Sequence, residues 1–307
     1  MLLAKRARLS KLAAVCLLVA LASTGAARLA SARPTSSLPG RPANATDASN
    51  AAATDVDHDR AQLHVLMVGN SYTFHHSLHT LLQQVAQGVA NGPRLVVDTE
   101  ARGGYSLRQH LRSGQAMAKI RSGRYSHVVL QGHSMSALDH PDQLAQDAER
   151  FKQAIDDATG HTVFYATWAR SPEARLYRTH KLVHSFEEMT DLVDTTYASI
   201  SQRLGANLAP VGRAFERSLV QNPKLALWDA DGSHPTVAGS FMAACVLYGA
   251  ITGADPRASS AVPEGLTSSQ AALIRAVAAQ SLSGDFVPSG LATAPVQDSA
   301  LGATQLN

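Results

Sequence analysis

The chain has 307 residues and a formal net charge of +3, from 27 basic and 24 acidic residues. Five of the basic residues and none of the acidic ones lie in residues 1–32, so the remainder holds 22 basic and 24 acidic residues, a net charge of about −2. This balance argues against nucleic acid or an anionic membrane surface as a partner, because both attract an excess of positive charge.

The first 32 residues have the pattern of an export signal. Four basic residues between Lys5 and Lys11 precede an apolar run from Leu12 to Ala22, and the small residues Ala30-Ser31-Ala32 follow. This order predicts a signal peptide over 1–32, cleaved after Ala32, and a secreted or periplasmic protein. The apolar run is shorter than the roughly 20 residues that span a membrane. We therefore expect no stable membrane insertion after cleavage; an uncleaved anchor is the alternative.

Composition divides the rest of the chain into three parts. Residues 33–60 are rich in Ala, Ser, Thr, Pro, Asn and Asp, which predicts a flexible leader, and residues 286–307 resemble them and are expected to form a disordered tail. Residues 61–285 are of a suitable length for one catalytic α/β domain.

Beyond the signal the only cysteine is Cys245, so no intrachain disulfide can form there. Its apolar surroundings predict a buried small hydrophobe.

Strand and helix patterns alternate along the central part. Five apolar, β-branched runs predict buried strands of a parallel sheet, at 63–68, 95–99, 127–131, 162–167 and 207–211. Helical patterns lie at 76–90, 106–121, 141–158, 180–204, 236–252 and 267–283. This alternation predicts a three-layer α/β/α fold around a doubly wound parallel sheet of about five strands.

Polar and glycine-rich residues follow four of the five predicted strands. Active sites of open parallel sheets lie at the carboxyl ends of the strands. One edge of the sheet is therefore expected to collect Ser71, Gly103, Gly104, Gln131, His133, Ser134, Trp168 and Arg170.

Two short segments contain the parts of a hydrolytic triad. Ser71 directly follows the first predicted strand and supplies a hydroxyl, with N-capping of the next helix as the alternative role. Asp231-Gly232-Ser233-His234 supplies an imidazole base and a carboxylate that can hold it in one tautomer. The close spacing requires a tight turn, for which Gly232 has the backbone freedom. Alternatively, this segment is only a helix entry, with Pro235 in the first helical position.

These motifs resemble the SGNH (GDSL-like) hydrolase superfamily. Gly69-Asn70-Ser71 stands where that family carries Gly-Asp-Ser, Gly103-Gly104 matches the glycine of its second block, and Asp231-x-x-His234 matches its terminal Asp-x-x-His. The similarity covers about residues 63–252. It implies a flavodoxin-like SGNH fold and a serine nucleophile at Ser71.

The resemblance is greatest to a bacterial branch with Gly-Asn-Ser-Tyr-Thr and Asp-Gly-x-His-Pro motifs, which also matches Leu130-Gln-Gly-His-Ser134 and Pro210-Val-Gly212. The family's third block, Gly-x-Asn-Asp, is absent. Its asparagine donates to the oxyanion in the family, so Gln131 is expected to supply an equivalent amide, with Ser134 as the second choice. Backbone N–H groups of Ser71 and Gly104 complete the expected oxyanion hole.

Other polar residues near these motifs are candidates for weaker roles. Trp168 and Arg170 could hold a sugar ring or a carboxylate, but Trp168 is equally compatible with a core aromatic residue. Asn70 and Ser134 are further weak candidates for contact with the substrate. His75, His76 and His79 follow the proposed nucleophile without a matching carboxylate pattern, so a polar helix face is expected and no metal site.

Three functions remain open from the sequence. The main expectation is a secreted serine esterase that hydrolyses short acyl esters, above all acetyl esters, on small molecules or carbohydrates, without a metal or organic cofactor. The second is an O-acyltransferase acting on glycans with the same triad. The third is a non-catalytic glycan-binding protein on a retained hydrolase fold.

Overall fold

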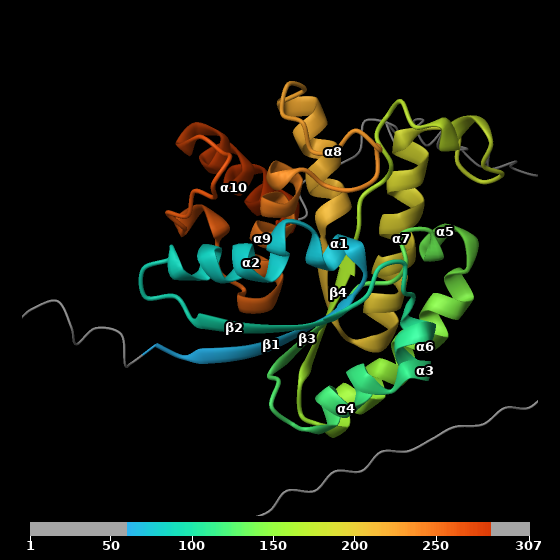
Figure 1. Cartoon of the computed structure of the whole chain (residues 1–307), viewed down its shortest axis with the longest axis vertical. Helices are drawn as coiled ribbons and strands as arrows, with labels where there is room; N and C mark the ends of the chain where they lie inside the picture. The colour runs from blue at the N-terminus through green and yellow to red at the C-terminus, as the bar shows by residue number, and fades with distance from the viewer. Residues whose placement is uncertain (1–59, 284–307) are drawn as a thin grey trace, which may run out of the picture. The chain divides into compact units, whose positions relative to one another are not determined.

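A five-stranded parallel sheet forms the centre of the computed structural model, which describes residues 60–283 (Figure 1). The predicted signal peptide (1–32), nearly all of the leader (33–60) and the tail (286–307) lie outside the described residues. The strands are β1 (Gln62–Gly69), β2 (Arg94–Ala101), β3 (His127–Leu130), β4 (His161–Ala166) and β5 (Asn207–Pro210).

The strand order is β2-β1-β3-β4-β5, with every neighbouring pair parallel. This is the flavodoxin-like doubly wound order, in which the chain reverses its direction of winding between β1 and β3. The predicted fold class is therefore confirmed. Because ligands of such sheets bind at the carboxyl ends of the strands beside this reversal, the loops after β1 and β3 border the expected site.

Helices cover both faces of the sheet, and alternate side chains of β1 enter opposite cores. Val65 and Met67 pack with one group of helices, whereas Leu66 and Val68 pack with the other. The first group is α2 (Leu78–Gln87), α8 (Val211–Gln221), α9 (Val237–Thr252) and α10 (Ser268–Leu282). The second is α3 (Leu107–Ser113), α4 (Gln115–Arg121), α5 (Ser136–Asp139), α6 (Pro141–Asp157) and α7 (Phe186–Leu204).

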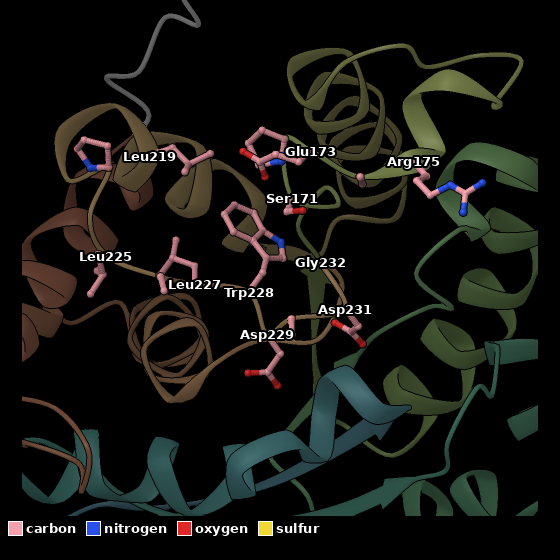
Figure 2. Close-up of a pocket in the computed structure, with 15 residues that line it drawn as sticks. Ser171, Glu173, Arg175, Leu219, Leu225, Leu227, Trp228, Asp229, Asp231 and Gly232 are labelled. Carbon is pink, nitrogen blue, oxygen red and sulfur yellow. The ribbon is translucent and has the colours of Figure 1, made fainter.

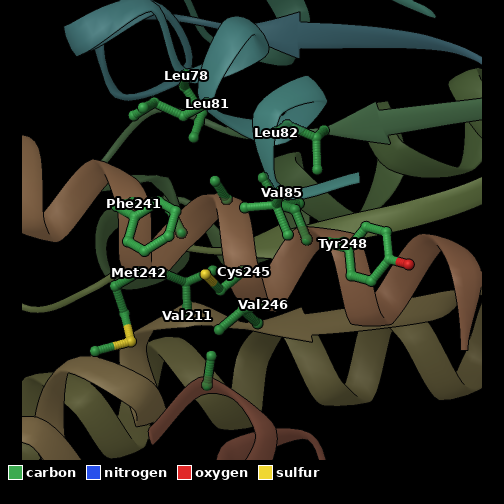
Figure 3. Packing of buried hydrophobic residues seen from close by; sticks show 14 of the residues in the cluster. Leu78, Leu81, Leu82, Val85, Val211, Phe241, Met242, Cys245, Val246 and Tyr248 are labelled. Carbon is green, nitrogen blue, oxygen red and sulfur yellow. The ribbon is translucent and has the colours of Figure 1, made fainter. Parts of the chain in front are cut away.

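Helix α9 is apolar on all sides because it is enclosed by α2, α10 and the sheet. Figure 3 shows Leu81 and Val85 of α2 directed toward α9, whose residues include Phe241 and Cys245. Cys245 is fully buried, as predicted, and burial raises the pKa of its thiol. Among the helices described between residues 60 and 283, none combines the length and apolar character needed to cross a membrane.

Several helix boundaries differ from the prediction. The pattern at 106–121 is two helices, because Gly114 adopts a left-handed conformation (φ 72°) between α3 and α4. Helix α7 begins only at Phe186, where the Ser185 side chain caps it. Helix α9 begins at Val237 rather than at Pro235. Helix α8 has no counterpart in the predicted elements.

Candidate functional site

Ser71 lies immediately after β1 and is the first residue of the short helix α1 (Ser71–Phe74). The capping residue is Asn70, whose side-chain oxygen accepts a hydrogen bond from the Tyr72 N–H group at 3.2 Å. The alternative role of Ser71 as the helix cap therefore does not apply. Its hydroxyl remains available for another partner.

The turn from Asp231 to His234 is built by hydrogen bonds to one carboxylate oxygen. The N–H groups of Ser233 and His234 both donate to Oδ1 of Asp231 at 2.8 Å. Gly232 has a φ of 65°, a left-handed conformation that glycine adopts without strain, as predicted. The turn brings the Asp231 carboxylate beside the His234 ring.

The structure brings the serine, histidine and aspartate together from segments more than 150 residues apart. His234 Nε2 lies 2.9 Å from Ser71 Oγ, and His234 Nδ1 lies 2.5 Å from Asp231 Oδ2. An ionised carboxylate only accepts hydrogen bonds, so Nδ1 carries the proton and the Nε2 lone pair faces the serine hydroxyl. This arrangement is suited to removing a proton from Ser71.

The Asp231 carboxyl is held in its ionised form. Burial opposes ionisation, but hydrogen bonds from the His234 ring and from two backbone N–H groups outweigh it and lower the pKa of Asp231 to about 2. Asp231 is exposed, while Ser71 and His234 are partly buried, so the group opens to solvent. A carboxylate that stays charged near neutral pH can stabilise a protonated imidazole.

The fully buried Gln131 does not fit the predicted oxyanion role. Its Oε1 accepts hydrogen bonds from the Asn70 N–H group and the Thr73 hydroxyl, each at 2.9 Å, and its Nε2 donates to the Gly132 carbonyl. Each end of the amide is thus bonded to the chain, and burial keeps the whole side chain away from solvent. Gln131 stabilises the junction of β1 and α1, and the prediction that it donates to an oxyanion is corrected accordingly.

Asn70 is also a structural residue rather than a substrate contact. It is 3% exposed, and its amide nitrogen donates to the carbonyls of Tyr105 (3.0 Å) and Gly132 (3.2 Å). These bonds join the loops that follow β1, β2 and β3. Burial excludes the predicted contact between its side chain and a ligand in this conformation.

Gly104 occupies an exposed turn from Arg102 to Tyr105, closed by a hydrogen bond from Tyr105 N–H to the Arg102 carbonyl at 3.1 Å. Its φ of 70° is that of the third residue of a type II turn, which favours glycine. Within residues 60–283, neither the Gly104 N–H group nor that of Ser71 makes a hydrogen bond. Both predicted backbone donors are therefore free.

Trp168 is a core aromatic residue, the second of the two roles that the sequence left open. It is 1% exposed and stacks between Tyr72 and Phe215, each with a ring-centroid separation of 4.5 Å. Its Nε1 donates to the Ser233 carbonyl at 2.9 Å. Burial prevents it from holding a sugar ring, but this bond supports the turn that carries His234.

Arg170 and Ser134, predicted as weak substrate contacts, lie together in a partly buried position. The Arg170 guanidinium donates to Ser134 Oγ at 3.1 Å and to the Tyr72 hydroxyl. The Tyr72 hydroxyl also lies 2.7 Å from Ser233 Oγ. A hydrogen-bonded chain thus links Arg170 to the turn that carries the imidazole.

His75 lies in the site beside His234, although its sequence pattern predicts a polar helix face. Its ring stacks on that of His234, with centroids 4.4 Å apart. Burial, followed by the nearby His234 and His76, lowers the pKa of His75, which favours its neutral form. Its position four residues after Ser71 was visible in the sequence, but the contact depends on the fold.

A cavity of about 560 Å³ opens beside Asp231 and Gly232. Figure 2 shows the indole of Trp228 between Glu173 and Asp229 in its wall. The lining combines charged groups with an aromatic side chain, so a polar organic group has room and partners next to the triad.

Known structures show the same architecture. A protein of Slackia heliotrinireducens, provisionally assigned to the SGNH hydrolases, is 28% identical over 62% of this chain and 99% of its own, with a TM-score of 0.53. A DUF4886 family protein of Bacteroides uniformis is 18% identical over 74% of this chain and 97% of its own, with a TM-score of 0.62, and shows the fold alone. No family model matches the chain, nor does any curated protein. The chain therefore has the fold of the SGNH (GDSL-like) hydrolases.

Proposed function

We propose that the chain is an exported serine esterase that hydrolyses short acyl esters through an acyl-Ser71 intermediate. The observation that carries this proposal is the pair of contacts of His234, with Ser71 Oγ at 2.9 Å from Nε2 and Asp231 at 2.5 Å from Nδ1. A hydroxyl, a base and an orienting carboxylate in this order form the set that ester hydrolysis by a serine requires. The similarity in fold to SGNH hydrolases supports the same reaction class.

The proposed reaction has two halves. Ser71 Oγ attacks the ester carbonyl while His234 Nε2 takes the hydroxyl proton, and the resulting tetrahedral species collapses to the acyl-serine as the alcohol leaves with that proton. Water then attacks the acyl-serine with His234 again as the base, which releases the carboxylic acid and restores Ser71. Asp231 remains ionised throughout and stabilises the protonated imidazole.

The oxyanion is assigned to the free backbone N–H groups of Ser71 and Gly104. No side-chain amide is included, because Gln131 is fully buried and its amide is bonded within the chain. Backbone donors fixed by the fold suit this role, since they need no reorganisation as charge develops on the oxygen. Loss of one such donor costs about 10²–10³ in turnover.

The substrate proposed is a short acyl ester, above all an acetyl ester. The alcohol portion would occupy the cavity of about 560 Å³ beside Asp231, whose wall includes Glu173, Arg175 and the Trp228 indole. A carbohydrate alcohol suits such a wall, because charged groups can bond hydroxyls and an indole offers an apolar face. Export is proposed on the signal pattern of residues 1–32.

The test is hydrolysis of p-nitrophenyl acetate together with labelling by a fluorophosphonate. The wild-type chain is expected to release p-nitrophenol and to become labelled, and Ser71→Ala is expected to lose both. Ser122→Ala, at an exposed serine after α4, is the matched control and is expected to keep both. Full activity in Ser71→Ala would contradict the nucleophile assignment, and an unlabelled, inactive wild-type chain would contradict the esterase proposal.

A further inference from the structure

Two histidines and an aspartate meet at the rim of the triad. One nitrogen each of His75 and His76 and one carboxylate oxygen of Asp229 all lie within 4.8 Å of one another. The histidines follow α1, whereas Asp229 precedes the turn that carries His234. The sequence pattern gave no carboxylate to accompany these histidines; the fold supplies one from a segment about 150 residues away.

The backbone at these histidines is in an unusual conformation. His76 and Ser77 have φ values of 48° and 52°, and non-glycine residues in this left-handed region carry strain of about 1–2 kcal/mol each. Adjacent side chains of a regular helix point in different directions. The left-handed step changes the course of the chain at His76, and the rings of His75 and His76 approach to 5.8 Å between centroids.

The groups around this cluster already hold its members in place. His76 Nε2 lies 3.0 Å from the Pro235 carbonyl. A carbonyl only accepts, so Nε2 carries the proton and Nδ1 keeps its lone pair. Such a hydrogen bond to a backbone carbonyl commonly orients a metal-binding histidine.

Asp229 is fixed through its backbone and free at its side chain. Its N–H group donates to the His234 carbonyl at 2.8 Å, and its own carbonyl accepts from Gly232 N–H at 2.9 Å. Within residues 60–283, its carboxylate forms no hydrogen bond or ion pair. Figure 2 shows this carboxylate directed toward the blue-green ribbon that follows β1.

We propose that His75, His76 and Asp229 form a binding site for a divalent transition-metal cation, Zn²⁺ in the first instance, whose occupation inhibits the triad. Two neutral imidazoles and a carboxylate are a common ligand set for Zn²⁺, with water completing the tetrahedron. Harder cations such as Mg²⁺ and Ca²⁺ prefer oxygen ligands and do not suit two imidazoles.

Inhibition follows from the stacking of His75 on His234, and this part of the proposal rests on the proposed esterase function. The two ring centroids are 4.4 Å apart. Ester hydrolysis requires His234 to carry a positive charge after it takes the Ser71 proton. A cation held by His75 repels that charge, so Zn²⁺ is expected to lower kcat/KM for p-nitrophenyl acetate by roughly ten-fold or more.

The test measures binding and inhibition separately. Titration calorimetry with ZnCl₂ uses the full chain without a polyhistidine tag and carrying Ser71→Ala, so the result does not depend on hydrolysis. His76→Asn and Asp229→Asn are then added singly, with His184→Ala, an exposed histidine outside the cluster, as the matched control. Inhibition of each variant with Ser71 intact is measured as the ratio of its own rates with Zn²⁺ and with chelator.

One Zn²⁺ is expected to bind, and each substitution in the cluster is expected to weaken binding by roughly ten-fold or more. Both substitutions are expected to relieve inhibition, and His184→Ala to change neither property. No binding, or binding that His76→Asn and Asp229→Asn leave unchanged, would overturn the site. Binding without inhibition of an active chain would overturn its coupling to the triad, and an inactive chain that still binds Zn²⁺ would overturn only the esterase proposal.

Discussion

The substitution Asp231→Asn separates the two functions of this carboxylate. In the native turn, Oδ1 accepts two backbone N–H groups and Oδ2 accepts the proton on His234 Nδ1. The amide of asparagine has only one oxygen. It can face either the two backbone donors or the imidazole, but not both.

The backbone donors decide the orientation. Turning the amide nitrogen toward them loses two hydrogen bonds at about 1 kcal/mol each. The oxygen therefore stays on the backbone, and the NH₂ group faces Nδ1, which must give up its proton. The proton moves to Nε2, so His234 no longer accepts from Ser71. A preference of about 2 kcal/mol leaves roughly one molecule in 30 with the productive tautomer.

The loss of charge adds to this effect. Asp231 is 48% exposed at its side chain, so we take about 1.5 kcal/mol, the lower end of the range for a charge-assisted hydrogen bond. Together, about 3.5 kcal/mol corresponds to a fall of roughly 400-fold in kcat. The turn itself is expected to persist, because both backbone hydrogen bonds remain.

Steady-state hydrolysis of p-nitrophenyl acetate and urea unfolding test these two statements together. Asp231→Asn is expected to unfold near the wild-type midpoint while losing activity, whereas Asp231→Ala loses both the activity and the backbone bonds and unfolds earlier. Asp142→Asn, an exposed aspartate at the start of α6, is the control for the chemical change alone. A kcat for Asp231→Asn within about ten-fold of wild type would refute the tautomer argument.

Three further substitutions probe the support of the site. Trp168→Ala removes a buried ring from a three-ring stack and is expected to lower the free energy of unfolding by about 3–5 kcal/mol, measured with urea. Gly69→Ala brings a Cβ to 2.1 Å from Thr73 Oγ1 and 2.5 Å from Gln131 Oε1, and is expected to cost about 2 kcal/mol by the same measurement; wild-type stability would refute this. Burial lowers the pKa of His110, so the unfolded chain binds a proton at this residue more readily than the folded chain does. The free energy of unfolding is therefore expected to fall as the pH falls below about 6.5. In His110→Gln this fall is expected to be less steep.

The strands and their order of appearance were accessible from the sequence because a parallel sheet buried on both faces requires continuous apolar runs. Val65, Leu66, Met67 and Val68 are all fully buried and stand out as such a run. The break between α3 and α4 was not predicted, although it lies at Gly114 and glycine is a typical helix-ending residue. Helix α8 directly follows the short strand β5 without a loop, so no loop residues in the sequence mark its start.

In the site, too, some residues could be predicted from the sequence and others could not. That Ser71, Asp231 and His234 lie in contact could be predicted, because the proposed hydrolysis constrains residue type and the turn constrains spacing. The orientation of a buried amide such as Gln131 depends on which carbonyls and N–H groups surround it, and those belong to loops distant in the sequence. Trp168 remained ambiguous for the same reason, since an aromatic residue after a strand suits a core or a ligand equally.

The two departures from the SGNH motifs, Asn70 and Gln131, are parts of one adaptation. Asn70 donates through its amide to the carbonyls of Tyr105 and Gly132 in a buried position. An ionised aspartate there offers only acceptors and would face two carbonyl oxygens. The Asn70 N–H group in turn donates to Gln131 Oε1, which also accepts from Thr73. The Asn70 side chain thus bonds two loop carbonyls, and the Gln131 side chain accepts from the Asn70 N–H group and the Thr73 hydroxyl. Together these hydrogen bonds connect the loops around Ser71 without a buried charge.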